Sequence, residues 1–120
     1  IEWKSGVNFI ANTQSGNKIH MDGPVDSGGE NNGARPTEVL ISGMGGCTAF
    51  DVISIAKHKG LEIQDFEIDI DAKRTDAKPS LINKIHLNYK IKSDKSNEKE
   101  LENIIKLSVK KIDTGIPFLF

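Results

Sequence analysis

Residues 35–60 read RPTEVLISGMGGCTAFDVISIAKHKG, and this stretch predicts the central element of the fold. Pro36 suits the first turn of a helix, where the N–H that proline lacks would have no partner anyway. Apolar and small residues then recur at largely helical spacing as far as Lys59, and Gly60 is a residue type that commonly ends a helix. The residues at this spacing are Val39, Leu40, Gly43, Met44, Cys47, Phe50 and Ile55. We therefore expect one long helix that begins at Pro36.

Three glycines in this stretch oppose helix formation. Gly43, Gly45 and Gly46 would each cost a helix interior about 1 kcal/mol relative to alanine. Glycine is usually retained at such positions because another part of the backbone passes close by. We therefore expect a close approach to this helix around residues 43–46.

The segment before the helix predicts a hairpin followed by a long loop. Residues 3–10 and 18–22 have the composition of two short strands, separated by a polar turn at residues 12–17. Residues 23–35 contain four glycines and one proline, which indicates a loop. A loop of this length is either functional or mobile.

The segment after the helix contains two strongly alternating stretches. Residues 65–72 alternate acidic and apolar side chains, and residues 84–92 alternate mainly basic and apolar ones. A period of two places each set on one side of a strand. The opposite charges favour antiparallel pairing across a loop around Pro79. The acidic row could be a metal site, but we favour a solvated ladder of cross-strand charge pairs.

A last helix is predicted after Ser96 or Asn97, either of which can cap it, with Glu100 in the capping-box position. Its buried stripe consists of Leu101, Ile104, Ile105, Ser108, Val109 and Ile112. The apolar residues 116–120 should pack on a partner or on the core, unless the full-length protein continues past them. The order of elements is strands, helix, strands, helix, which predicts an α+β fold in a single domain over residues 1–120.

Composition excludes several classes of protein. The 120 residues carry 16 basic and 17 acidic side chains, so no global field attracts nucleic acid or an anionic membrane. A single cysteine cannot form an internal disulfide, which suits a reducing cytoplasm. We also expect no membrane span, because no apolar run approaches about 20 residues, and no signal peptide.

The sequence carries none of the common cofactor or catalytic motifs. It lacks a phosphate loop, a dinucleotide fingerprint and a Ser/His/Asp signal, so we expect no cofactor. His20, His58 and His86 are scattered and have no second ligand at helical spacing, so we expect no metal.

Cys47 is the remaining candidate for a functional side chain, and its presence has two possible explanations. Free cysteine is often a small buried apolar residue. A reactive thiolate instead needs a lowered pKa. The dipole of the predicted helix contributes little, because Cys47 lies eleven residues after Pro36. Arg35 is the nearest basic residue on the N-terminal side, about three helical turns away.

Taken together, Gly23-Pro24, the glycine-rich loop and the stretch quoted above resemble the OsmC/Ohr family (osmotically inducible and organic hydroperoxide resistance proteins). The nearest pattern is that of the YhfA-like branch. The matching positions are Pro36, Glu38, Leu40, Gly45, Gly46, Cys47, Thr48, Asp51, Val52, Ser54 and Ile55.

The resemblance implies an α+β fold with an antiparallel sheet, a long central helix and an intertwined homodimer that has two active sites at the subunit interface. The glycines around Cys47 would let a helix of one subunit pass close to the other. In active members a peroxidatic cysteine attacks an organic hydroperoxide, a second cysteine resolves the sulfenic acid, and an arginine with a glutamate activates the first thiol.

Carried over by residue, the match to the active members is partial. Cys47 occupies the peroxidatic position. Glu38 matches the YhfA-like glutamate but lies one residue after the peroxidase position, which is Thr37 here. No arginine precedes Arg35, and the only basic residues before it are Lys4 and Lys18. Asp113 stands at the second-cysteine position.

These departures leave three functions open. The first is a redox protein with the single cysteine Cys47, which acts on organic hydroperoxides or disulfides with an external thiol reductant. If Asp113 faces Cys47, its charge would raise the thiol pKa and oppose turnover. The alternative is a non-catalytic dimeric relative that binds a small apolar ligand in the interface pocket. The third is a purely structural dimer.

Overall fold

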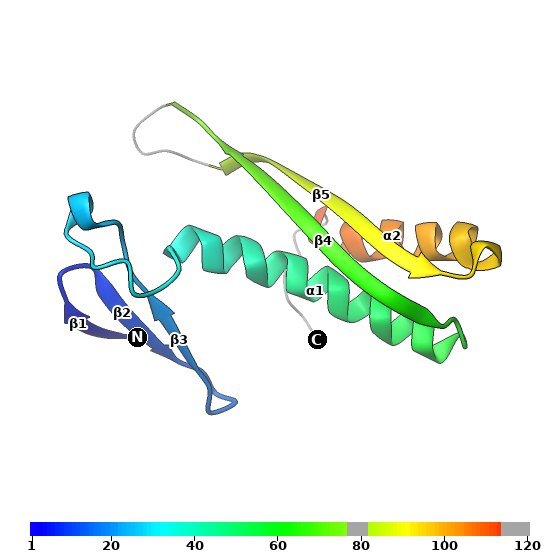
Figure 1. The fold of residues 1–120 in the computed structure, drawn as a ribbon, viewed down its shortest axis with the longest axis horizontal. Helices are drawn as coiled ribbons and strands as arrows, with labels where there is room; N and C mark the ends of the chain where they lie inside the picture. Colours follow the sequence, from blue (N-terminus) through cyan, green and yellow to red (C-terminus); the bar gives the residue numbers. More distant parts are fainter. Residues whose placement is uncertain (77–81, 114–120) are drawn as a thin grey trace. The chain divides into compact units, whose positions relative to one another are not determined.

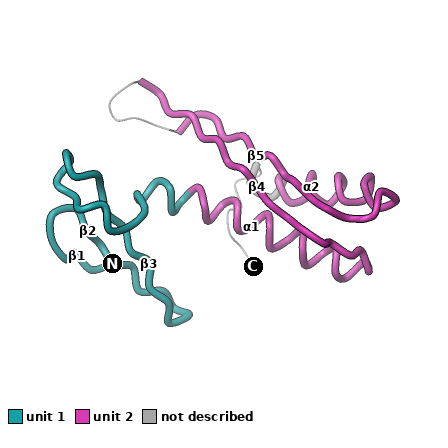
Figure 2. Tube along the Cα trace, in the orientation of Figure 1, with its two compact units in different colours: residues 1–40 teal, residues 41–120 magenta. Residues whose placement is uncertain are grey.

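The computed structural model describes residues 1–76 and 82–113, with side chains through Lys110. The chain divides into two compact units, residues 1–40 and residues 41–120, each described by itself (Figure 2). The predictions for the loop around Pro79 and for residues 116–120 concern chain outside the described residues. A single domain over residues 1–120 stays a prediction.

The first unit contains a three-stranded antiparallel sheet in the order β1-β2-β3 (Figure 1). The strands are β1 (Glu2–Ser5), β2 (Asn8–Asn12) and β3 (Lys18–Met21). The prediction of a single strand over residues 3–10 was wrong, because the chain turns between β1 and β2. Gly6 makes this turn with a positive φ of 49°, and its carbonyl accepts a hydrogen bond from Trp3 Nε1 at 2.9 Å.

A buried carboxylate orders the loop that follows β3. Asp22 is 1% exposed and accepts backbone hydrogen bonds from Gly23 at 2.7 Å, Asn32 at 3.1 Å and Glu30 at 3.2 Å. The loop also contains a short 3-10 helix, η1 (Val25–Ser27). The N–H groups of Asn32 and Gly23 hold the pKa of Asp22 below its ordinary value. The predicted glycine-rich loop therefore folds back on itself around the carboxylate of Asp22.

The long helix α1 (Pro36–His58) is present as predicted and ends as its sequence indicates. Gly60 has a positive φ of 73°. Its N–H donates to the carbonyl of Lys57 at 3.1 Å, and the N–H of Leu61 donates to the carbonyl of Ala56 at 2.8 Å. These two bonds form the Schellman motif that glycine favours after a helix.

In the second unit, β4 (Ile63–Arg74) and β5 (Ile82–Ser93) form an antiparallel ribbon (Figure 1). Its register confirms the predicted pairing: Phe66 lies opposite Ile91, and Glu67 lies opposite Lys90. Lys90 Nζ also contacts Asp69 Oδ2 at 2.8 Å. The acidic row thus faces a mainly basic one, which is the charge ladder that we favoured.

The chain then passes through η2 (Lys95–Asn97) into α2 (Glu98–Asp113). Asn97 directly precedes α2 as predicted, and its side-chain amide donates to Ser93 Oγ at 3.2 Å. The carboxylate of Glu100 pairs with Lys59 at 3.5 Å.

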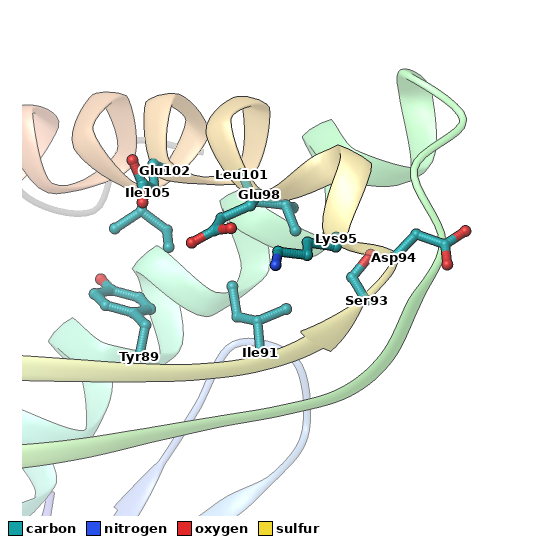
Figure 3. A pocket seen from close by; sticks show the side chains of 9 residues that line it. All are labelled: Tyr89, Ile91, Ser93, Asp94, Lys95, Glu98, Leu101, Glu102 and Ile105. Carbon is teal, nitrogen blue, oxygen red and sulfur yellow. The ribbon is translucent and has the colours of Figure 1, made fainter.

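The core of the second unit lies between the apolar face of the ribbon and the two helices. Its fully buried apolar residues are Val52 and Ala56 from α1, and Leu101 and Ile104 from α2. Figure 3 shows Tyr89 and Ile91 projecting from β5 toward Leu101 and Ile105. The predicted α2 stripe is confirmed from Leu101 to Val109. Ile112 lies outside the described side chains, and the fold class is α+β as predicted.

Candidate functional site

Helix α1 has one face packed into the second unit. Gly45, Thr48, Val52 and Ala56 are buried on this face. A Cβ atom added at Gly45 would collide with Cδ1 of Ile70 on β4. The expected close approach is therefore found at Gly45, although the neighbour is a side chain and not a backbone. Close packing on β4 accounts for the glycine.

The opposite face of α1 is apolar and exposed. Phe50 is 64% exposed and Ile53 is 43% exposed. A Cβ atom added at Gly43 or Gly46 would have no described atom within 4 Å. The packing of the single described chain therefore does not explain these two glycines.

Cys47 lies on this exposed side of α1 and is half-buried. With Gly43, Gly46 and Phe50 it lines a shallow hollow of about 360 Å³. Two glycines, a thiol and a phenyl ring give this hollow an apolar lining. Cys47 is thus not a fully buried core residue within the described chain, and a small apolar molecule could reach its sulfur.

The surroundings of Cys47 do not favour its thiolate. Burial raises the pKa of the Cys47 thiol, and the carboxylate of Asp51, one turn later on α1, raises it further. Both effects act in the same direction because each disfavours a negative charge. At neutral pH the sulfur of the single chain is therefore mainly a thiol. Efficient attack on a peroxide would require a cation from elsewhere.

Glu38 makes a defined structural contact. Its Oε1 accepts a hydrogen bond from the backbone N–H of Arg35 at 2.8 Å, at the start of α1. Glu38 and Cys47 are nine residues apart along α1, which corresponds to roughly 13.5 Å of helical rise. The described contact gives Glu38 a role in helix capping. Its catalytic role is implied by the resemblance alone.

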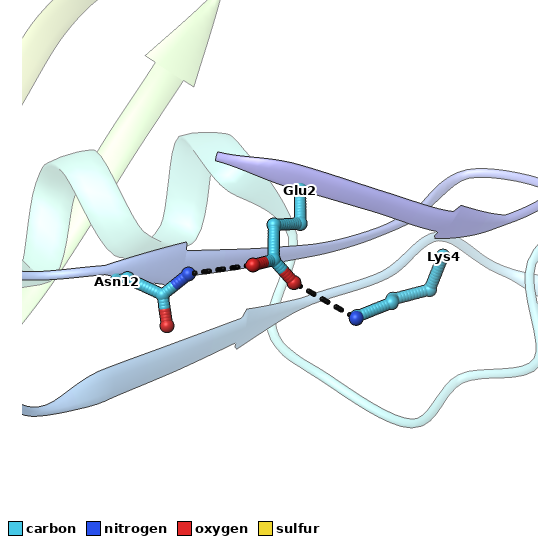
Figure 4. A network of polar contacts seen from close by, with 3 residues as sticks. All are labelled: Glu2, Lys4 and Asn12. Carbon is cyan, nitrogen blue, oxygen red and sulfur yellow. Dashed lines mark hydrogen bonds and ion pairs between the residues drawn. The ribbon is translucent and has the colours of Figure 1, made fainter.

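Two basic residues of the first unit, Arg35 and Lys4, have partners within that unit. Arg35 Nη1 donates to Asn31 Oδ1 at 2.8 Å and to the carbonyl of Gly33 at 3.3 Å. Lys4 Nζ contacts Glu2 Oε2 at 2.8 Å, as Figure 4 shows. Its bond and charge lower the pKa of Glu2. The guanidinium of Arg35 therefore supports the loop before α1.

The side chain of Asp113 lies outside the described residues, so its approach to Cys47 stays a prediction. Among the residues described, no group of three or more His, Cys, Asp or Glu side chains could hold a metal ion.

Two buried polar groups, a carboxylate and a hydroxyl, were not found from the sequence. One is Asp22, which could have been noticed as an acid that opens a glycine-rich loop. The other is Tyr89, whose hydroxyl oxygen is buried and has no hydrogen-bond partner in the part of the chain that the structure describes. Burial raises the pKa of Tyr89, and the nearby Thr48 hydroxyl opposes this shift. The alternation over residues 84–92 places Tyr89 among the apolar side chains of its strand and gives no sign of a buried hydroxyl.

The expectation that no apolar stretch reaches membrane length was wrong for α1. This helix has 23 residues and is long and apolar enough to cross a membrane. Of its most apolar stretch of 18 residues, 22% is buried. Length and composition do not separate a membrane span from a core helix. The packing of Val52 and Ala56 against α2 is typical of a core helix.

Comparison with known proteins identifies the class. The family model described as OsmC-like protein matches residues 29–112, so the chain belongs to the OsmC-like family. Protein YhfA of Escherichia coli K12 is 28% identical over 111 residues, which cover 92% of this chain and 80% of YhfA. The predicted OsmC and YhfA-like resemblance is thereby confirmed.

Solved structures agree with this assignment. A hypothetical protein from Aquifex aeolicus VF5 is 31% identical, with a TM-score of 0.71 over 89% of this chain and 74% of that one. An OsmC-like protein of unknown function from Vibrio cholerae has a TM-score of 0.73 at 14% identity, over 92% and 84% of the two chains. At that identity the likeness shows the fold alone.

Proposed function

We propose that this OsmC-like protein uses Cys47 as a single redox-active thiol, which acts on organic hydroperoxides or disulfides and is regenerated by an external thiol. The observation that carries the proposal is the position of Cys47. Its half-buried sulfur lines an apolar hollow on the exposed side of α1, within the family motif. An apolar lining favours the carbon body of an organic substrate.

The chemistry balances with one protein sulfur. The Cys47 thiolate attacks the terminal oxygen of the hydroperoxide, the O–O bond breaks, and the alkoxide takes a proton and leaves as the alcohol. The sulfur gives up two electrons and becomes a sulfenic acid. One external thiol then forms a mixed disulfide and releases water. A second external thiol displaces the protein thiol and leaves as a small disulfide.

The proposal includes a homodimer in the cytoplasm. A second copy would cover the exposed Phe50 and Ile53 and would use the open space beside Gly43 and Gly46. It would also be the source of a cation near Cys47, whose pKa is raised within the single chain. Glu38 and Asp113 belong to this proposed site through the resemblance.

A turnover assay tests the redox function. We expect the protein to accelerate the consumption of cumene hydroperoxide by dithiothreitol, and we expect Cys47→Ser to abolish the acceleration. Glu38→Gln separates a catalytic role from a capping role, because loss of capping alone lowers thermal stability without changing the rate at a permissive temperature. Equal rates for the wild type and Cys47→Ser would contradict the proposal.

The raised pKa of Cys47 favours a second candidate function, in which the same hollow binds a small apolar ligand without chemistry. Native mass spectrometry of protein purified from a cell extract would show a bound ligand. In this case Cys47→Ser would keep the ligand, whereas Phe50→Ala, which removes one wall of the hollow, would lose it.

A further inference from the structure

We infer that a groove between β5 and α2 binds a small amphiphilic amine at a site separate from Cys47. The groove has a volume of about 370 Å³ and lies beside the N-terminal half of α2 (Figure 3). Small-molecule sites in proteins span roughly 300–1,000 Å³, so this volume suits a compact ligand. All the residues that line the groove belong to the second unit.

The inner wall of the groove is apolar. Tyr89 and Ile91 line it from β5, and Leu101 and Ile105 line it from α2. The Tyr89 ring contacts Phe66 edge-on, with ring centroids 6.2 Å apart and an interplanar angle of 72°. This contact orients an aromatic ring that a ligand could pack against. An apolar body next to an aromatic face also suits an ammonium group, which is attracted to the π-system.

The rim of the groove is mainly acidic. Glu98 and Glu102 of α2 line it, against the ammonium group of Lys95, whereas the carboxylate of Asp94 points away from Tyr89 and Ile91 in Figure 3. Glu98 and Glu102 are four residues apart on α2, so they share one side of the helix. Neither forms an ion pair within the described chain, whereas the intervening Glu100 is paired with Lys59.

These charges determine the class of ligand. The N-terminus of α2 by itself would attract an anion. The two carboxylates of Glu98 and Glu102 outnumber the one ammonium group of Lys95, which gives the rim the opposite preference. An apolar wall with an acidic rim is complementary to a molecule that joins a short hydrocarbon or aromatic body to one primary ammonium group. A free fatty acid or a phosphate would meet repulsion at the same place.

Titration of the full chain with 2-phenylethylammonium chloride, followed by two-dimensional amide NMR at constant ionic strength, tests the site. We expect shifts at Ile91 and along residues 94–105, with saturation. The double variant Glu98→Gln/Glu102→Gln should bind about tenfold more weakly. The matched control Glu67→Gln/Asp71→Asn removes two carboxylates from the outer face of the ribbon and should bind like the wild type.

Two further comparisons complete the test. The neutral probe 2-phenylethanol should bind more weakly than the amine, and Cys47→Ser should leave amine binding unchanged, since the groove is separate from the thiol. The inference is overturned if the groove residues do not shift, if the alcohol binds as well as the amine, or if the control variant loses as much affinity as the Glu98/Glu102 variant.

Discussion

At the scale of single residues, the ionisation of Cys47 decides whether it is a reactive thiolate or only a small apolar residue. Cys47 is only half-buried, which argues against a simple core residue. Burial and the charge of Asp51 nevertheless both raise the pKa of its thiol. Cys47 can therefore become a reactive thiolate only if its electrostatic surroundings change so that its pKa falls. Asp51 is the side chain through which this dependence can be measured within one chain.

Asp51→Asn removes the charge that raises the pKa of Cys47, so the thiolate fraction at neutral pH should increase. We expect alkylation of Cys47 by iodoacetamide at pH 7 to become about threefold faster, and the pH at which the rate is half-maximal to fall. Stopped-flow alkylation over a pH series measures both quantities. An unchanged rate profile would show that Asp51 does not act on the thiol.

Gly45 and Ile70 should be energetically coupled. Gly45→Ala inserts a methyl group against Cδ1 of Ile70 and should lower the free energy of unfolding by about 2 kcal/mol. Ile70→Val removes the colliding Cδ1, so the double variant should lose less than the sum of the single losses. Urea unfolding of the four proteins gives the coupling. Additive losses would contradict this contact.

At the scale of elements, α1 and the ribbon were predicted more accurately than the N-terminal strands. Period-two alternation and opposite charges predicted the pairing of β4 with β5, since both signals persist over many residues. The division of β1 from β2 depends on the single positive φ of Gly6, which leaves little trace in a hydrophobic pattern. The Asp22 loop depends on hydrogen bonds up to ten residues apart, which local patterns do not contain.

The Asp22 loop should lose order when its carboxylate is neutralised. Asp22→Asn keeps the shape of the side chain but weakens its bonds to three backbone N–H groups. Hydrogen exchange at Gly23, Glu30 and Asn32 should become roughly tenfold faster, and exchange along β4 and β5 should not change. Equal protection in wild type and variant would show that the carboxylate does not hold the loop.

The same loop should respond to acid. Because the pKa of Asp22 is lowered in the folded state, its contribution to stability is complete above the ordinary value near pH 4. The contribution is lost as the pH falls through the lower folded-state pKa. Loop protection should therefore be constant from neutral pH to about pH 5 and fall only below it.

At the scale of the whole molecule, the exposed face of α1 is the feature that one chain leaves unexplained. The sequence predicted the long helix and a close approach to it around Gly43, Gly45 and Gly46. Of these three glycines, only Gly45 has a described neighbour close enough to exclude a side chain. The surroundings of Cys47 could not be predicted further, because a pattern along one chain contains no partner surface. The proposed homodimer would supply this surface.

Phe50 tests the homodimer. Phe50→Asp places a charge on the exposed apolar face of α1 and should raise the dissociation constant of the dimer at least about a hundredfold. The conservative variant Phe50→Leu should remain dimeric. Sedimentation equilibrium measures both variants against the wild type. A wild-type chain that is monomeric at every concentration would contradict the proposed dimer.

Intact-mass analysis after substoichiometric cumene hydroperoxide is the sharpest test of whether Cys47 is the redox-active group. We expect one oxygen to be added at Cys47 before Met21 or Met44 reacts, and we expect a small thiol then to convert this product to a mixed disulfide. Oxidation of the methionines while Cys47 stays unmodified would contradict the claim.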